Sequence, residues 1–314
     1  ILVIISPSTT GTVRADLHEQ LKTLERFEVK ITQHSWTQGN VKQVGDWLIN
    51  KDFLEADLRI ILGEVKPDPI AGYSGGSSIL FPGLADIGTI ESRLRQTFNP
   101  ESRFAVLGGN PVQVASREIL NLVGVDFAVN IVSDPKGMPM KVFSGAPDKS
   151  WRSAVELAEK IYTTPIERGE AVVVSAGGYP YDRTLYRANL TVENVARLRR
   201  REATVILLAE ASEGYGDLSF YKYMTEYKDI RNLERSLRMK WTMGGEAAYR
   251  LRKVMESGQL VLVSMIPDNI ARALNLKVTR TASDALNYAN KRAGKELKVV
   301  VVPFGSVTIL ASKV

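Results

Sequence analysis

Residues 64–90 read EVKPDPIAGYSGGSSILFPGLADIGTI, and this stretch interrupts regular secondary structure. An apolar, strand-like run at Leu58–Leu62 leads into it, and a Pro-Gly pair at Pro82 and Gly83 closes it. Glycines at this density permit positive φ angles and let a backbone or a ligand approach closely. A loop of this kind directly after a buried strand is where α/β proteins place their ligand sites. We therefore take this loop as the first candidate site.

Outward from this loop, strand-like apolar runs alternate with helical patterns in both directions. Such alternation predicts an α/β fold with two doubly wound domains and largely parallel sheets. A composition change at residues 145–149 places the domains at 1–146 and 147–314, with the last strand a candidate to return to the first domain. The predicted strands are 1–5, 29–32, 58–62, 104–107, 126–133, 141–145, 171–175, 203–209, 260–265 and 298–303. The predicted helices are 15–24, 87–96, 112–123, 150–162, 192–201, 216–238, 246–256 and 283–293.

Composition narrows the class of protein. Hydrophobic residues make up 44% and charged residues 24%, as in ordinary soluble domains. The net charge of +6 is spread along the chain except for RLRRR at 197–201, which we interpret as a solvated helix end. No nucleic-acid-binding module is recognisable. No apolar run reaches the ~18 residues of a membrane span. The chain has no cysteine, which excludes disulfides and thiolate catalysis. It begins on a strand pattern without a signal peptide, so we expect a cytoplasmic protein with further residues upstream of Ile1.

Several catalytic motifs lack residues that their chemistry requires. Gly72–Gly76 matches the G-x-S-x-G nucleophile elbow of α/β-hydrolases, whose histidine follows the serine. The two histidines of this chain, His18 and His34, both precede it. Dinucleotide-binding and P-loop motifs are absent. Two histidines without clustered ligand spacing do not indicate a metal site, so no metal ligand is predicted.

Three separated stretches carry a family resemblance. Residues 10–14 read TGTVR, residues 67–78 read PDPIAGYSGGSS with Pro-Gly and Thr-Ile following, and residues 175–188 read SAGGYPYDRTLYRA. Together they resemble the nickel-dependent lactate racemase family, in which the same positions read T-G-T-H-R, P-H-x-x-A-G-x-S-G-G-x-K and S-x-G-G-Y-P-x-D-x-x-x-Y-Q-A. The resemblance implies two α/β domains with a ligand site in the cleft between them. It also implies an isomerase, a racemase or epimerase of 2-hydroxy acids.

The chain departs from that family at the chemically active positions. The resemblance implies a lysine that tethers a nickel-pincer nucleotide where this chain has Ser78, and a nickel-binding histidine where it has Leu94. Two proton-transferring histidines correspond to Val13 and Asp68. A serine hydroxyl cannot replace the amine, and leucine and valine offer neither a metal ligand nor a base. We therefore expect that nickel chemistry is lost, and we predict no cofactor.

We predict that the remaining scaffold binds a small anionic organic acid or a nucleotide, without nucleic acid or membrane partners, and leave a homo-oligomer open. Two alternatives stay open: an active racemase or epimerase of the nickel-dependent family, and a cofactor-free enzyme that uses Asp68 as its base. Asp68 is the candidate catalytic residue. Glycine-loop N–H groups and two arginines suit an anion. The candidate ligand-binding residues are Arg14, Ser74, Gly75, Gly76, Ser78, Gly177, Gly178, Tyr179, Asp182 and Arg187.

Overall fold

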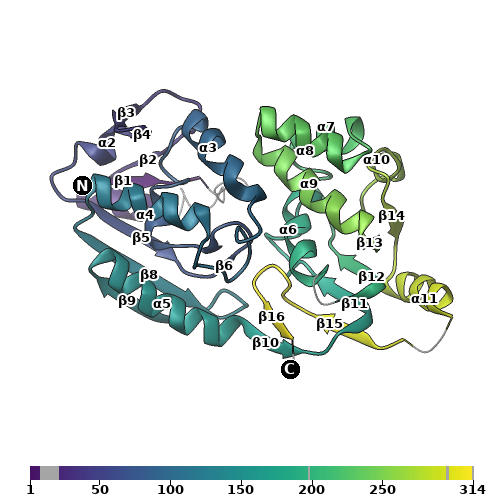
Figure 1. Cartoon of the computed structure of the whole chain (residues 1–314). Helices are drawn as coiled ribbons and strands as arrows, with labels where there is room; N and C mark the ends of the chain where they lie inside the picture. The colour runs from purple at the N-terminus through teal and green to yellow at the C-terminus, as the bar shows by residue number, and fades with distance from the viewer. Residues whose placement is uncertain (8–20, 197–198, 295–296, 313–314) are drawn as a thin grey trace. The chain divides into compact units, whose positions relative to one another are not determined.

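The computed structural model describes residues 1–7, 21–196, 199–294 and 297–312 (Figure 1). The chain divides into two compact units, Ile1–Ile161 and Tyr162–Val314. Both units combine helices with strands, and most strand pairs of the described residues are parallel, so the predicted α/β class with largely parallel sheets is confirmed. Arg14, His18 and the helix predicted at 15–24 fall mostly on residues 8–20, outside the described part of the chain.

The second unit is built on a five-stranded parallel sheet in the order β14-β13-β12-β11-β15. The AVVV run of its strand β11 is buried throughout, as in parallel strands that are covered on both faces, whereas the VVVV run of β15 alternates between exposed and buried residues. The strands are β11 (Gly169–Ser175), β12 (Arg199–Leu208), β13 (Gln259–Val263), β14 (Lys277–Thr279) and β15 (Val299–Val302). A separate parallel pair joins β10 (Thr163–Ile166) to β16 (Ile309–Ser312) within this unit.

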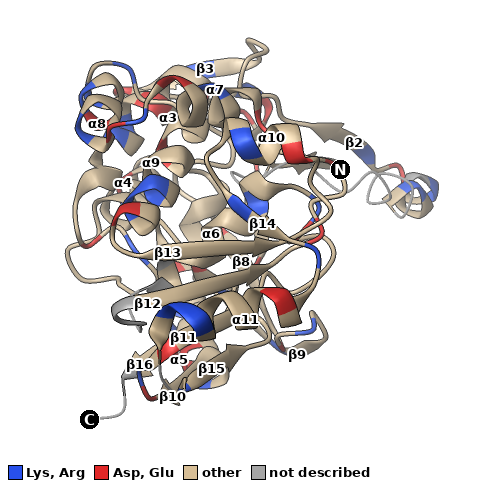
Figure 2. Ribbon diagram, turned by 90° about the vertical axis from the view of Figure 1, so that its right-hand side faces the viewer, with Lys and Arg blue, Asp and Glu red and all other residues tan. Residues whose placement is uncertain are grey.

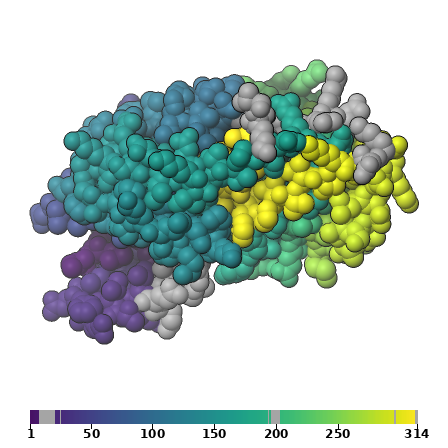
Figure 3. Space-filling model, turned by 90° about the horizontal axis from the view of Figure 1, so that it is seen from below, coloured from purple at the N-terminus to yellow at the C-terminus, as the bar shows by residue number. Residues whose placement is uncertain are grey.

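Helices connect these strands and carry charges of both signs. Helices α8, α10 and α11 each carry both basic and acidic side chains (Figure 2). The edge strand β15 lies at the surface of the unit (Figure 3), and Val301 on it is 64% exposed. The helices are α6 (Leu185–Ala196), α7 (Leu218–Glu226), α8 (Ile230–Met239), α9 (Met243–Glu256), α10 (Asp268–Ala273) and α11 (Ala282–Ala293).

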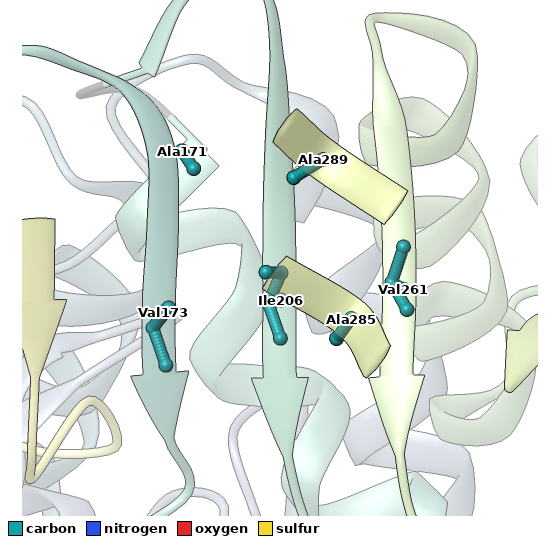
Figure 4. Packing of buried hydrophobic residues seen from close by; sticks show 6 residues of the cluster. All are labelled: Ala171, Val173, Ile206, Val261, Ala285 and Ala289. Atoms are coloured by element: carbon teal, nitrogen blue, oxygen red, sulfur yellow. The ribbon is translucent and has the colours of Figure 1, made fainter. Parts of the chain in front are cut away.

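The core of this sheet follows from the alternation of side chains along parallel strands. Successive residues of a strand point to opposite faces. One face of β11, β12 and β13 presents Val173, Ile206 and Val261 to Ala285 and Ala289 of α11 (Figure 4). The small alanines let α11 lie close to the sheet. Helices α6 and α9 pack together and cover the opposite face, so the sheet is buried on both sides.

The first unit has a smaller, mixed set of sheets. Its main sheet has the order β5-β8-β9, in which β5 (Ile60–Glu64) is parallel to β8 (Phe127–Ser133) and β8 forms an antiparallel hairpin with β9 (Pro139–Gly145). Further pairs are β1 (Leu2–Ile5) with β2 (Lys30–Gln33), β3 (Val41–Val44) with β4 (Trp47–Asn50), and β6 (Pro67–Asp68) with β7 (Gly72–Tyr73). The α-helices are α2 (Lys51–Leu54), α3 (Ile87–Leu94), α4 (Pro111–Val123) and α5 (Pro147–Tyr162); 3-10 turns are η1 (Lys22–Phe27), η2 (Gly76–Ile79) and η3 (Arg95–Phe98).

Some predicted elements are wrong. The strand predicted at 104–107 is a turn, because Ala105 has a φ of 60° and donates its N–H to Gly72 O at 3.1 Å. The helix predicted at 192–201 begins earlier, at Leu185, and Arg199–Arg201 open β12 instead of ending a helix. The strand predicted at 298–303 is not the last, since β16 follows it. The β3–β4 hairpin, β10, α10 and β14 were not predicted.

The two compact units divide the chain between Ile161 and Tyr162, so α5 belongs almost wholly to the first unit. The domain boundary that we place between residues 146 and 147 stays a prediction. Trp151 of α5 donates its Nε1 hydrogen to the carbonyl oxygen of Ser74 at 2.9 Å. No helix in the described part of the chain is long and apolar enough to span a membrane.

Candidate functional site

The glycine loop of the first unit follows β5 and is bound to that strand by its serine. Ser74 Oγ donates to the carbonyl oxygen of Glu64 at 2.9 Å and accepts the N–H of Lys66 at 3.2 Å. The backbone N–H of Ser74 donates to the carbonyl oxygen of Lys66 at 2.9 Å. The Ser74 hydroxyl is therefore engaged within its own chain.

Gly75 and Gly76 are required by close packing as well as by their backbone angles. Their φ angles are 76° and 52°. A Cβ on Gly75 would stand 2.6 Å from Val65 Cγ2, and one on Gly76 would stand 2.6 Å from Trp151 Cδ1. Real Cβ atoms do not approach other atoms so closely, so both positions accept only glycine without rearrangement.

Buried polar side chains form hydrogen bonds with backbone groups of the same loop. Asn130 Oδ1 accepts the N–H of Gly76 at 3.1 Å, and Asn130 Nδ2 donates to Ser150 Oγ at 3.1 Å. Gln113 Nε2 donates to the carbonyl oxygens of Ala71 and Tyr73 at 2.7 and 2.9 Å. These bonds satisfy backbone groups that burial would otherwise leave unpaired. Asn130 and Gln113 were not predicted, because they lie tens of residues from the loop in sequence.

Asp68, the candidate catalytic residue, has a structural contact of its own. Its Oδ1 accepts the N–H groups of Ile70 at 2.9 Å and Ala71 at 2.7 Å. This arrangement is an Asx turn that shapes the β6–β7 hairpin. Ser78 lies in η2, where its N–H donates to Gly75 O at 3.1 Å and its carbonyl accepts from Gly83 N at 3.2 Å.

The glycine loop of the second unit lies at the point where the strand order reverses. Its strand, β11, has β12 on one side and β15 on the other. In open parallel sheets, ligands bind at the carboxyl ends of the strands at such a point. The loops after β11 and β15 meet there: Gly305 donates its N–H to Ser175 O at 2.9 Å, and a Cβ on Gly177 would stand 3.3 Å from Ser306 Oγ.

This second loop has space and unused polar groups. Gly178, with a φ of 75°, has no atom within 4 Å of its Cβ position, and Tyr179 is 63% exposed. Ser306 Oγ is buried without a hydrogen-bond partner among the described residues. It is therefore a polar group that the described residues leave unsatisfied.

Arg187 is a basic side chain that contacts this second glycine loop. It lies in the first turn of α6, and its Nη1 donates to the carbonyl oxygen of Pro180 at 3.1 Å. No carboxylate of the described residues forms an ion pair with it. Burial lowers the pKa of the Arg187 guanidinium, and the nearby charge of Arg183 lowers it further. An anion beside Arg187 would offset both effects.

Arg183 and Glu213 form an ion pair beside Arg187, and neither was predicted. The Arg183 Nε donates to Glu213 Oε1 at 2.8 Å, and Nη2 donates to the same oxygen. The hydrogen bond to Glu213 raises the pKa of Arg183. The Arg183 guanidinium also lies 5.5 Å from the centre of the Tyr179 ring. The sequence signal that could have located Glu213 was the glycine-containing loop ASEGYGD at 211–217. This loop follows β12, the strand adjacent to β11.

The structure thus places the predicted ligand-binding residues in two groups. Ser74, Gly75, Gly76 and Ser78 lie together in the first unit. Gly177, Gly178, Tyr179, Asp182 and Arg187 lie together in the second. Arg14 lies outside the described residues. The cleft between domains stays a prediction.

Two described residues stand at positions that the resemblance assigns to the nickel cofactor, Leu94 and Ser78. Leu94 lies at the end of α3 and is 2% exposed, within the core of the first unit. Ser78 offers a hydroxyl. Among the described residues, no group of three or more histidine, cysteine, aspartate or glutamate side chains is placed to hold a metal ion.

Comparisons with known proteins agree with the motifs. Residues 9–105 match the model of the lactate racemase N-terminal domain, and residues 165–310 match that of the lactate racemase C-terminal domain. The chain belongs to the lactate racemase family. The resemblance inferred from the three motifs is thereby confirmed.

Named relatives of this family member are moderately distant. A lactate racemase of Thermoanaerobacterium thermosaccharolyticum is 25% identical over 321 aligned positions, covering 98% of this chain and 74% of the relative. A lactate racemase of Lactiplantibacillus plantarum is 24% identical, covering 94% and 74%. The lactate racemase apoprotein structure from T. thermosaccharolyticum has the same fold, with a TM-score of 0.90, 22% identity and coverage of 99% and 78%. A Thermotoga maritima protein structure gives a TM-score of 0.71 at 16% identity, covering 99% and 86%.

Proposed function

We propose that this lactate racemase family member binds a small 2-hydroxy acid or a related anion, and that its nickel chemistry is lost. The observation that carries the proposal is Arg187, a half-buried guanidinium whose described partner is a neutral carbonyl, Pro180 O, at 3.1 Å. A partly buried cation without a counter-charge is unfavourable. A carboxylate bound there would remove that cost and form charge-assisted hydrogen bonds.

The surroundings of Arg187 supply groups for the rest of such a ligand. The loop at residues 177–182 leaves open space at Gly178, where backbone can approach a ligand. Ser306 Oγ in the adjoining loop after β15 is buried and has no partner among the described residues, so this loop would have to open for the hydroxyl to meet that of a ligand. A guanidinium for the carboxylate and a hydroxyl for the substituent beside it are the groups that a 2-hydroxy acid requires.

The residues of the first unit support the loss of the nickel chemistry. When bound in the family, the nickel-pincer nucleotide accepts and returns a hydride. Its tether and its metal ligand correspond here to Ser78 and Leu94, and these side chains do not fit the group. A buried leucine cannot ligate a metal, and a serine hydroxyl cannot form the amine-derived linkage. Asp68 is poorly suited to act as a catalytic base through Oδ1, because this oxygen already accepts two backbone N–H groups.

A binding measurement tests the anion site. We expect D- or L-lactate to bind in a calorimetric titration, and the Arg187→Gln variant to bind it at least about tenfold more weakly, as expected for loss of a charge-assisted contact. Arg238→Gln is the matched control, because Arg238 lies on a helix of the same unit and pairs with Glu234. Equal binding by wild type and Arg187→Gln, or no binding of any small 2-hydroxy acid, would contradict the proposal.

Intact mass and nickel content test the second part. The protein is coexpressed with the enzymes that make the nickel-pincer nucleotide, then purified and analysed. We expect the unmodified mass and less than stoichiometric nickel, because position 78 is a serine. A covalent adduct with one nickel per chain would instead support an active racemase or epimerase. The Ser78→Lys variant serves as a positive test of whether a tethering amine is the missing element.

A further inference from the structure

The Arg183–Glu213 ion pair is held in place by the main chain and does not depend on side-chain contacts alone. Glu213 donates its N–H to Arg183 O at 2.9 Å, and Ala211 donates to Asp182 O at 2.8 Å. Leu185 in turn donates to Gly214 O at 3.0 Å. The loop after β12 and the start of α6 are thus joined on both sides of the pair. Glu213 is fixed opposite Arg183.

Close packing reinforces this arrangement. Gly216 has a φ of 87°, and a Cβ there would stand 2.7 Å from Thr184 Cβ. The two loops therefore approach each other as closely as glycine permits. Arg183 cannot turn toward a ligand without giving up Glu213, while the backbone keeps the carboxylate nearby.

The charges of Arg183, Glu213 and Arg187 consequently add to one. Arg183 and Glu213 cancel, and Arg187, one helical turn further on, keeps a charge that no described carboxylate pairs. The charged groups that act on Arg187 are Arg183 and Glu213. A ligand with a single negative charge matches this arrangement, whereas a second carboxylate would meet Glu213.

We propose that Glu213 determines specificity: by occupying Arg183, it restricts the site to 2-hydroxy acids with one carboxylate and discriminates against dicarboxylates. The inference rests on the proposed anion site at Arg187 and goes further by naming the ligand charge and the residue that sets it. A near-identical ligand can be rejected by withholding the partner that its extra charge requires. Here Glu213 pairs with Arg183 in the free protein, so a second carboxylate is left without a cation.

The test compares lactate, a monocarboxylate, with malate, a dicarboxylate, by titration calorimetry at low ionic strength. We expect wild type to bind lactate at least about tenfold more tightly than malate, because desolvating a second carboxylate without a cationic partner costs roughly this much. The Glu213→Gln variant keeps the size of the side chain and the backbone bonds, but frees the charge of Arg183. It should bind malate about tenfold more tightly than wild type does, with lactate changed by less than about threefold.

Glu234→Gln is the matched control for this variant. Glu234 accepts from Nε and Nη2 of Arg238 through one oxygen, Oε1, as Glu213 does from Arg183, but it lies on α8. Its substitution should leave the ratio of malate to lactate affinity unchanged. The double variant Glu213→Gln, Arg183→Gln should lose the gain in malate affinity, since the freed cation is gone. This readout separates specificity from a general loss of stability.

The outcomes distinguish the two proposals. If wild type binds neither acid, the proposed anion site fails. If wild type binds lactate and Glu213→Gln leaves the ratio of affinities unchanged, only the role of Glu213 is overturned. A wild type that already prefers malate would overturn it as well. A rise in malate affinity that persists in the double variant would show that Arg183 is not the second anchor.

Discussion

The two glycine loops of this chain look alike in sequence and differ in structure. Both have a serine and a Gly-Gly pair shortly after a strand, SGG at 74–76 and SAGG at 175–178. In the first, Val65 and Trp151 fill the space beside the glycines. In the second, the space at Gly178 is empty. A glycine pair can therefore serve to admit the protein's own side chains or to leave room for a ligand.

The polar groups of the two loops follow the same division. The Ser74 hydroxyl and the Gly76 N–H bind groups of the first unit itself. Near the second loop, Ser306 Oγ has no described partner and Arg187 has no described carboxylate. We infer that the first loop is chiefly a scaffold, although Tyr73 Oη and Gln113 Oε1 beside it lack partners among the described residues, and that the second loop leaves open space at Gly178.

Alanine substitution at each pair is the most direct way to break this comparison. Gly76→Ala should destabilise the protein by about 3 kcal/mol, because the new Cβ overlaps the Trp151 ring and the positive φ is strained. Gly178→Ala should cost only about 1 kcal/mol, since it has the strain without the overlap. Both values are measured by denaturant unfolding.

Ligand binding provides the opposite ranking for the same two variants. In Gly178→Ala, the loss of free energy of lactate binding should exceed the loss of free energy of unfolding, because the new methyl group enters the open space. Gly76→Ala, where it folds, should bind lactate as wild type does. Equal costs of unfolding for the two variants would show that the loops do not differ as described.

The sequence predicted the class of fold and both loops, but not this difference between them. Valine-rich runs and breaker-rich loops are local signals, and they located β11, β15 and both glycine pairs. Trp151 fills the space beside Gly76 in the first loop, and Glu213 pairs with Arg183 near the second. Such contacts depend on which strands are neighbours, which local pattern does not specify.

The errors have similar causes. The run FAVL at 104–107 has a strand-like composition, yet Ala105 takes a positive φ to meet Gly72. Conversely, the β3–β4 hairpin had a readable signal in the Gly-Asp turn at 45–46, where Gly45 has a φ of 57°. Tertiary contacts overrode local preference in the first case. In the second, the local preference was present and was not used.

The pH dependence of stability provides a smaller test of the contacts at the downstream end of the first loop. His34 is 4% exposed; its Nε2 donates to Ala85 O at 3.0 Å, and Asn50 Nδ2 donates to Nδ1 at 3.1 Å. This pattern requires a neutral ring, because a carbonyl only accepts and Nδ1 is already an acceptor. Burial lowers the pKa of His34 below 6.5, against the bond to Ala85 and the charge of Asp86, which raise it.

The sign of the effect follows from proton counts. Because the folded pKa is the lower one, the unfolded chain binds more protons as pH falls through 6.5. The His34 contribution is complete above that pH and is lost below it, so the free energy of unfolding should fall between pH 7.5 and 5. His34→Gln should reduce this fall by an amount on the order of 1 kcal/mol. Since wild type and variant share His18, their difference isolates His34. The same slope in both proteins would mean that folding does not lower the pKa of His34, which would contradict the neutral, buried ring.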